Sequence, residues 1–220
     1  MEIEVIRKPV YLLVMRDVFD KETNELIRLE AQNLRTENAT VMSGVDKAIR
    51  SNQVIFMDDL YKPTKDNPNK RQQSILLNAF ETKFQSNEFT EILCSSDFPL
   101  NHFNLTNYHE TQVSTYDNGE KYMWHIDGMR DKSRCISMVY YFFKEPKGFE
   151  GGEICFTNSP IYNCHPIKEP NFKEEHYIEI TPENNMLVVF SSNLPHSVKD
   201  ANASDKSFIR YSAQVWVGLR

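Results

Sequence analysis

The apolar and polar positions of this 220-residue chain follow two patterns, one up to residue 107 and another after it. Helical spacing dominates the first part, in which the apolar run Val10–Met15 is suited to a buried strand. Asp20 is the expected N-cap of a first helix. The apolar stripe expected on that helix consists of Leu26, Ile27, Leu29, Ala31 and Leu34.

Two further helices and one exposed loop are expected before residue 107. Helical patterns run from about Gln72 to Phe84 and over Phe89–Cys94. The segment Tyr61–Lys70 is polar and contains two prolines, which is typical of an exposed loop. We expect the basic residues in and after this loop to be solvated, and the loop is a candidate frame for a substrate entrance. These basic residues are Lys62, Lys65, Lys70 and Arg71.

From Thr111 onward, short runs rich in β-branched and aromatic residues alternate with turn sequences. Asn118-Gly119 predicts a tight hairpin turn, and Asp200–Lys206 predicts an extended turn. Residues 157–176 carry no clear pattern, and a loop of that length is usually functional or mobile. The expected strands are Thr111–Tyr116, Lys121–His125, Cys135–Phe143, Ile154–Phe156, Tyr177–Ile180, Met186–Phe190 and Phe208–Val217. Many short strands at this spacing favour a sandwich or barrel, such as a double-stranded jelly roll.

Composition narrows the classes of protein that remain. With 40% hydrophobic and 25% charged residues, the chain is typical of a soluble globular protein. Its net charge of −6 argues against binding to a nucleic-acid backbone. No apolar run approaches the roughly 18 residues of a membrane span, and we expect no secretory signal and a cytoplasmic location. The four cysteines show no Cys-x-x-Cys spacing and are expected to be inert thiols.

His125-Ile126-Asp127 is the first candidate for chemistry. Positions i and i+2 of a strand face the same side, so both side chains could reach one metal ion. Taken alone, this triplet favours a hydrogen-bonded histidine near a turn over a metal ligand. His196, which follows the apolar strand Met186–Phe190, supplies a third candidate ligand. Two histidines and one carboxylate leave open positions on the metal, as in non-haem Fe(II) oxygenases, although zinc hydrolases also use this set.

Arg210 favours the oxygenase alternative. It lies inside the otherwise apolar strand Phe208–Val217. An arginine there either reaches solvent from an edge strand or is buried and awaits a carboxylate, which it binds through two parallel hydrogen bonds. A dicarboxylate that chelates iron at one end and contacts Arg210 at the other is what a 2-oxoglutarate-dependent enzyme requires.

The second half of the chain resembles the Fe(II)/2-oxoglutarate dioxygenases, specifically the prolyl 4-hydroxylase-like group. The motifs that carry the resemblance are Tyr116-x-x-Gly119-x-x-Tyr122-x-Trp124-His125-x-Asp127, Arg134–Tyr141, Gly151-Gly152-Glu153, Pro182–Phe190 leading to His196, and Arg210–Trp216. The resemblance implies that Fe(II), 2-oxoglutarate and O₂ are the cofactor and co-substrates. It implies that His125, Asp127 and His196 bind iron, and that Arg210 binds the distal carboxylate of 2-oxoglutarate. Tyr141 matches a second donor to that carboxylate, and Tyr116 matches another tyrosine of the pocket.

Two positions limit the activity that the resemblance implies. Many relatives with collagen-type activity carry lysine at the position of Arg210, which speaks against procollagen as the substrate. Related halogenases replace the carboxylate ligand by a small residue, whereas Asp127 is present here. The other histidines (His102, His109, His165 and His176) have no paired spacing and are not expected in the site. Trp124 and Trp216 are expected to be packing residues.

We therefore expect a mainly β fold, a distorted jelly roll (double-stranded β-helix) with N-terminal helices, in a single domain over residues 1–220. Within it, residues 1–107 form the strand and helical support, and residues 108–220 form the catalytic core. The expected activity is hydroxylation of a prolyl or other residue in a peptide or protein, with release of succinate and CO₂. Hydroxylation of a free amino acid or other small molecule, and metal or ligand binding without catalysis, stay open, as does the oligomeric state.

Overall fold

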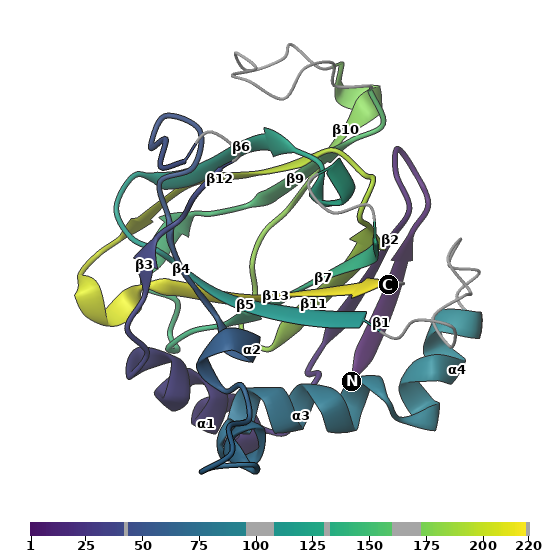
Figure 1. The fold of residues 1–220 in the computed structure, drawn as a ribbon. Coiled ribbons are helices and arrows are strands. Elements are labelled where there is room, and N and C mark those ends of the chain that lie inside the picture. Colours follow the sequence, from purple (N-terminus) through teal and green to yellow (C-terminus); the bar gives the residue numbers. More distant parts are fainter. Residues whose placement is uncertain (42–43, 96–107, 130–132, 160–172, 219–220) are drawn as a thin grey trace.

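The computed structural model describes residues 1–41, 44–95, 108–129, 133–159 and 173–218. Two antiparallel sheets lie over one another, and helices cover the outer face of the larger sheet (Figure 1). The mainly β fold expected from the sequence is confirmed. His102, Cys164 and His165 lie outside the described residues.

The larger sheet contains strands from both parts of the chain. Its order is β1 (Glu2–Ile6), β2 (Leu12–Arg16), β11 (Met186–Ser191), β7 (Arg134–Phe142), β13 (Arg210–Gly218), β5 (Tyr108–Tyr116), β4 (Gln53–Phe56) and β3 (Glu37–Asn38). The prediction of one strand before residue 107 is therefore wrong, because β1, β3 and β4 also lie there. These three strands are short and partly exposed at the sheet margins, so their apolar patterns are weak.

The smaller sheet contains only strands that lie after the predicted hairpin turn in the sequence. Its order is β10 (Tyr177–Ile180), β9 (Ile154–Thr157), β12 (His196–Ala203) and β6 (Glu120–His125), with β8 (Phe149–Gly151) also paired to β12. The hairpin predicted at Asn118-Gly119 is wrong, because β5 and β6 belong to different sheets. The turn itself is present, with Gly119 at φ +72°, but it carries the chain from one sheet to the other.

The extended turn predicted over Asp200–Lys206 is also wrong in its first half. Strand β12 continues to Ala203, and Ala201 pairs with Gly151 of β8. Ala201 and Ala203 are buried while Asn202 between them is exposed, which is the alternation of a strand. Local composition favours a turn here because alanine, asparagine and aspartate have low β propensity, and the pairing to β8 overrides that preference.

Four α-helices lie among the described residues: α1 (Lys21–Gln32), α2 (Met57–Leu60), α3 (Ile75–Phe84) and α4 (Asn87–Ser95). Asp20 caps α1 as predicted, since its side chain accepts a hydrogen bond from the Thr23 backbone N–H at 2.8 Å. The apolar stripe predicted for α1 is wrong in part. The buried positions are Asn24, Ile27 and Ala31, whereas Leu26 and Leu29 are exposed. Within these described helices, none is long and apolar enough to cross a membrane.

Alternation along the central strands separates two hydrophobic cores. In β7, Tyr140 belongs to the core between the larger sheet and the helices, and Tyr141 belongs to the core on the opposite face of the sheet. Tyr211 of β13 also faces the helices, so its neighbour Arg210 faces the smaller sheet. Arg210 and Tyr141 therefore lie on the same, inner face of the larger sheet.

Residues 61–70 connect α2 to α3 on the helical side of the larger sheet (Figure 1). None of them lines the pocket between the sheets, so the interpretation of this loop as a frame of the entrance is wrong. Arg71 is only partly exposed, and it forms ion pairs with Asp58 at 2.7 Å and with Glu81 at 2.6 Å. Most of the patternless segment over residues 157–176, namely residues 160–172, lies outside the described residues.

Candidate active site

The three predicted metal ligands come together at one edge of the smaller sheet. His125 ends β6 and His196 begins β12, and the two are direct partners across this antiparallel pair. Asp127 follows in a 3₁₀ turn (Asp127–Met129). Its two carboxylate oxygens each lie 3.6 Å from an imidazole Nε2, one from His125 and one from His196. One candidate ligand atom from each residue lies within 4.8 Å of the other two.

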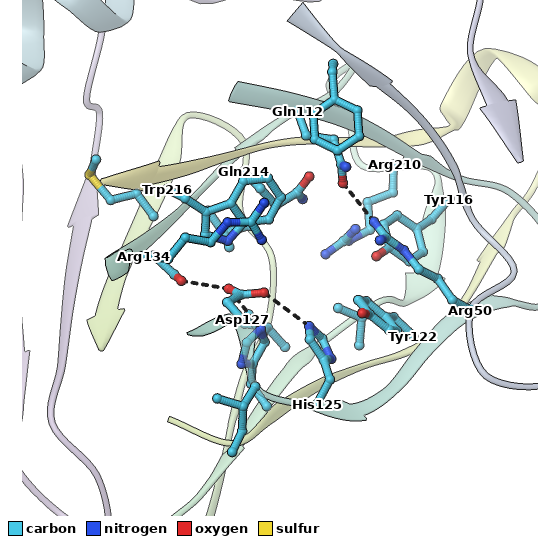
Figure 2. Close-up of a pocket in the computed structure, with 18 residues that line it drawn as sticks. Arg50, Gln112, Tyr116, Tyr122, His125, Asp127, Arg134, Arg210, Gln214 and Trp216 are labelled. Atoms are coloured by element: carbon cyan, nitrogen blue, oxygen red, sulfur yellow. Dashed lines mark hydrogen bonds and ion pairs between the residues drawn. The ribbon is translucent and has the colours of Figure 1, made fainter. Parts of the chain in front are cut away.

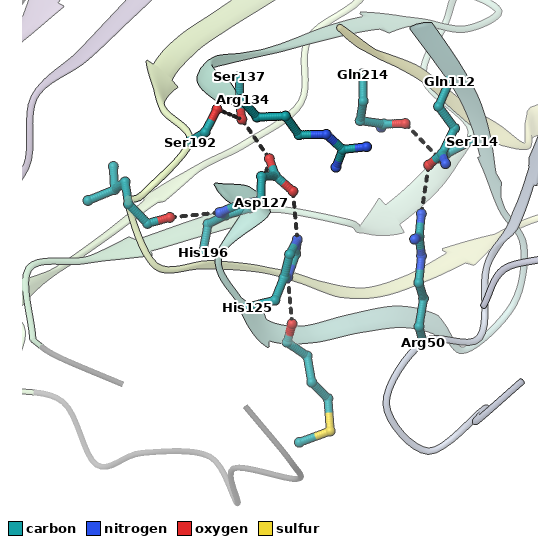
Figure 3. Close-up of polar contacts among 12 residues, drawn as sticks. Arg50, Gln112, Ser114, His125, Asp127, Arg134, Ser137, Ser192, His196 and Gln214 are labelled. Atoms are coloured by element: carbon teal, nitrogen blue, oxygen red, sulfur yellow. Dashed lines mark hydrogen bonds and ion pairs between the residues drawn. The ribbon is translucent and has the colours of Figure 1, made fainter. Parts of the chain in front are cut away.

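Backbone carbonyls orient both imidazole rings. The Nδ1 atom of His125 donates to the carbonyl of Met123 at 2.9 Å, and that of His196 donates to the carbonyl of Leu194 at 2.9 Å (Figure 3). A carbonyl only accepts, so Nδ1 carries the proton in each ring and Nε2 keeps a free lone pair. Both Nε2 atoms lie toward Asp127, which is the orientation that metal-binding histidines require.

Asp127 is held by a short hydrogen-bond chain. Ser137 donates to its Oδ2 at 2.6 Å, and Ser137 and Ser192 share a hydrogen bond of 2.9 Å. Burial alone would raise the pKa of Asp127, but His196, His125 and the Ser137 hydroxyl outweigh it and hold the pKa below its ordinary value. Burial, followed by the proximity of His125, lowers the pKa of His196 to about 4. An ionised carboxylate beside a neutral imidazole matches the protonation that metal binding needs.

Arg210 is buried in the same pocket, and no carboxylate of the described residues pairs with it. It is 1% exposed, and its Nε and Nη1 atoms make no hydrogen bond within the described residues. Its Cζ atom lies 4.4 Å from the ring centroid of Tyr116 and 4.8 Å from that of Tyr141. The alternative of an arginine that reaches solvent is therefore wrong. A buried guanidinium that has unused N–H donors and an aromatic ring on each side is suited to bind a carboxylate.

Tyr116 and Tyr141 flank this guanidinium, and each has a hydroxyl group that can donate a hydrogen bond. Tyr116 pairs with Arg210 across β5 and β13. Burial raises the pKa of both phenols, so both hydroxyls are protonated at neutral pH. The Tyr141 hydroxyl has no hydrogen-bond acceptor among the described residues, although it lies beside Arg210. It can therefore donate to an anion held by Arg210.

The pocket also contains residues that the sequence analysis did not select (Figure 2). Tyr122 stacks on His125 with ring centroids 3.6 Å apart. Trp216, expected only to pack, forms part of the pocket wall beneath Arg134, whose Cζ lies 3.9 Å from the ring centroid. Further lining residues that were missed are Arg50, Gln112 and Gln214. The stretch before β4 that contains Arg50 has no periodic pattern, and only strand pairing brings these residues together.

The other histidines that the structure describes lie away from the three ligands. His109 is in β5 at a separate pocket with Asp58 and Arg71. His176 is partly exposed and forms a hydrogen bond with Asn158. Trp124, also expected to pack, lies 6.0 Å from Tyr177 between ring centroids.

The donor set fits Fe(II), and the pocket fits 2-oxoglutarate. Two neutral imidazoles and a carboxylate on one side of a metal leave open positions for further ligands. His125, Asp127, His196 and Arg210 all line one pocket. A dicarboxylate could therefore bind the metal at one end and the open donors of Arg210 at the other.

Comparison with known proteins identifies the part of the chain that carries this site. Residues 111–218 match the model of the 2OG-Fe(II) oxygenase superfamily. An uncharacterized PKHD-type hydroxylase of Synechocystis sp. is 32% identical over 112 residues, which is 49% of this chain and 35% of that protein. The chain thus spans about a third of the length of this curated relative.

Solved structures show the same fold. A prolyl hydroxylase from Trichoplax adhaerens, in complex with a peptide fragment of hypoxia inducible factor, aligns with a TM-score of 0.61 at 16% identity, over 94% of this chain and 83% of that chain. A prolyl-4-hydroxylase of Pseudomonas putida aligns with a TM-score of 0.55 at 19% identity, over 94% and 92%. The segment 111–218, with the three ligands and Arg210, therefore belongs to the 2OG-Fe(II) oxygenase superfamily and has a prolyl 4-hydroxylase-like fold.

Proposed function

We propose that this protein is an Fe(II)- and 2-oxoglutarate-dependent hydroxylase. The observation that carries the proposal is the pairing, in one pocket, of a two-histidine, one-carboxylate site with a buried arginine whose donors are open. When bound, Fe(II), 2-oxoglutarate and O₂ supply the oxidation of an unactivated C–H bond to an alcohol, with release of succinate and CO₂. The two sheets, in our interpretation, form the distorted jelly roll that surrounds this chemistry.

One group of residues would bind the iron, and a second group would bind 2-oxoglutarate. His125, Asp127 and His196 would hold the iron, with the imidazole tautomers fixed by backbone carbonyls and the carboxylate by Ser137. Arg210 would pair with the distal carboxylate of 2-oxoglutarate, and Tyr141 would donate a second hydrogen bond to it. The pocket between the sheets limits access of water, so that these charges act at a low local dielectric constant.

A prolyl or other residue in a peptide or protein is the proposed substrate class. Support comes from fold similarity to prolyl hydroxylases, one of them in complex with a peptide fragment. A free amino acid or another small molecule is the second class, and the buried Arg50 in the pocket wall favours a substrate with an anionic group. A protein that binds metal or ligand without catalysis, or a zinc hydrolase, would not couple 2-oxoglutarate to the reaction.

The test is succinate release by the purified protein with and without Fe(II) and 2-oxoglutarate. Release that requires both supports the proposal, and stimulation by a compound from a peptide and amino-acid panel identifies the substrate class. Mass spectrometry should then find the gain of one oxygen atom in that compound. His125→Ala should abolish release, while His176→Ala, a histidine outside the pocket, should not. Succinate release by a metal-free preparation would overturn the proposal.

A further inference from the structure

Arg50 is a buried arginine in the pocket wall for which 2-oxoglutarate binding gives no role. It is 9% exposed and lines the same pocket as the three metal ligands (Figure 2). Its Cζ atom lies 4.4 Å from the ring centroid of Tyr122, and that ring stacks on His125 at 3.6 Å. Two successive ring contacts therefore connect this guanidinium to a metal ligand.

Neutral groups are the hydrogen-bond partners of Arg50. Its Nε donates to Oδ1 of Asn52 at 3.0 Å. Its Nη2 donates to Oε1 of Gln112 at 2.7 Å (Figure 3). Among the residues that the structure describes, no carboxylate lies within ion-pair distance of it. The contrast with Arg134 is clear, since that guanidinium pairs with Glu110. A buried charge without an opposite charge is costly, so the position favours a bound anion.

When the charges of the described pocket residues, the metal and 2-oxoglutarate are added up, the positive charge of Arg50 is left without a negative partner. The described lining residues include three arginines and one carboxylate, Asp127. Glu110 compensates Arg134 from outside the lining. In the proposed enzyme, Asp127 and the first carboxylate of 2-oxoglutarate compensate Fe(II), and the distal carboxylate compensates Arg210. One positive charge then remains, on Arg50.

We propose that Arg50 binds a carboxylate of the primary substrate and thereby selects an anionic substrate. This inference rests on the proposed function, because the charge balance assumes bound Fe(II) and 2-oxoglutarate. Asn52 and Gln112 fix the plane of the guanidinium, and a planar guanidinium binds a carboxylate through two parallel hydrogen bonds. The carboxylate could belong to a free amino acid or to an acidic side chain within a peptide, and the chemistry at Arg50 is the same for both.

The test uses acetate as a carboxylate probe and acetamide as its neutral equivalent. Mn(II) replaces Fe(II), 2-oxoglutarate is saturating and O₂ is absent, so no turnover occurs. Mn(II) accelerates the proton relaxation of a small molecule that binds near it, and the methyl relaxation of each probe is measured by NMR. We expect the wild-type complex to relax acetate more strongly than acetamide. Equal relaxation of the two probes would overturn the proposal.

Variants assign the effect to Arg50. Arg50→Gln should weaken acetate binding by about tenfold or more, since it removes hydrogen bonds to a charged group. Arg50→Lys, which keeps the charge, should lose less. The control Arg28→Gln changes an arginine of α1 that pairs with Glu25, and it should behave as wild type. Acetate relaxation that persists unchanged in Arg50→Gln, as expected for direct binding to the metal, would also overturn the proposal.

Two further probes distinguish the source of the carboxylate. L-Proline presents the carboxylate of a free amino acid, and N-acetyl-aspartate N-methylamide presents an acidic side chain within a peptide. The probe with the stronger Arg50-dependent relaxation identifies the source, and no Arg50-dependent relaxation of either contradicts the inference. Titration of 2-oxoglutarate into the same variants keeps the two proposals separate. Arg50→Gln should leave this affinity unchanged, whereas absence of 2-oxoglutarate binding to wild type would instead overturn the proposed function.

Discussion

Gly152 and Arg210 pack so closely that a Cβ atom on Gly152 would lie 2.7 Å from Cδ and 3.0 Å from Nε of the arginine. Gly152 also adopts φ +73°, where a side chain is disfavoured. The absence of a side chain at this position therefore lets the guanidinium lie between Tyr116 and Tyr141.

Gly152→Ala should displace Arg210 and weaken 2-oxoglutarate binding by about tenfold, the equivalent of one hydrogen bond to a charged group. Gly119→Ala is the matched control, because Gly119 has φ +72° but a Cβ atom there would have no neighbour within 4 Å among the described residues. Both variants should lose similar stability from backbone strain. Titration of 2-oxoglutarate into the Mn(II) protein measures the difference, and equal affinities would show that the close packing has no part in binding.

Arg210→Ala should weaken 2-oxoglutarate binding by roughly two to three decades, from the loss of one partner of a buried ion pair at about 3–5 kcal/mol. Arg210→Lys should recover only part of this, since an ammonium is a point charge without the planar two-donor geometry. Tyr141→Phe should cost less, about 1–2 kcal/mol, because it deletes a single hydrogen bond. Metal affinity without 2-oxoglutarate should barely change in all three. Wild-type affinity in Arg210→Ala would contradict the co-substrate site.

Ser137→Ala should lower metal affinity by about 10- to 100-fold, because the hydroxyl orients Asp127 from outside the ligand set. The control is Ser212→Ala, which removes a buried hydroxyl that accepts a hydrogen bond from Gln214 and does not contact the ligands. Calorimetric titration with Mn(II) compares the two. If both variants bind Mn(II) as wild type does, the hydroxyl does not support the carboxylate.

His125→Ala or Asp127→Ala should abolish both metal retention and turnover, since each removes one of three ligands. Wild type should bind one Fe(II), and Mn(II), Co(II) or Ni(II) should substitute structurally. Metal content after desalting measures retention, with His176→Ala as the histidine control. A His125→Ala protein that retains a full equivalent of metal would exclude this site.

The metal-free protein should lose stability as pH falls from about 6.5 to about 4. The pKa of His196 is lowered to about 4 in the folded state, from an ordinary value of 6.5. In this window the unfolded chain binds the proton and the folded chain does not, so protonation favours unfolding. The thermal midpoint of His196→Gln should therefore depend less steeply on pH than that of wild type. Parallel curves for the two proteins would show that His196 does not titrate in this way.

Local pattern was enough for several elements around the site, although strand β12, which begins at His196, is not among them. The strand that ends at His125, the apolar strand before His196 and the capped helix after Asp20 all follow from short-range preferences. The i, i+2 spacing of His125 and Asp127 indicated a shared metal, although Asp127 lies in a 3₁₀ turn that follows the strand and not on the strand itself. Helix and strand periodicity depend on neighbours a few residues apart, which is why the sequence reports them.

The order of strands in space could not be predicted in this way. Placing β5 and β6 in different sheets, and extending β12 to Ala203, required long-range pairing that overrides local propensity. The same pairing brings Arg50 to Tyr122 and Gln112, residues that are far from it in sequence.

The sequence by itself determined the ligand types, the arginine inside an apolar strand and a mainly β fold, because each depends on residue identity and local spacing. Only the tertiary structure decided that Arg210 is buried with open donors, that Gly152 makes room for it and that Arg50 has no carboxylate partner among the described residues. Burial and charge compensation depend on every group that packs around a side chain, and those groups come from strands that meet only in the folded sheets.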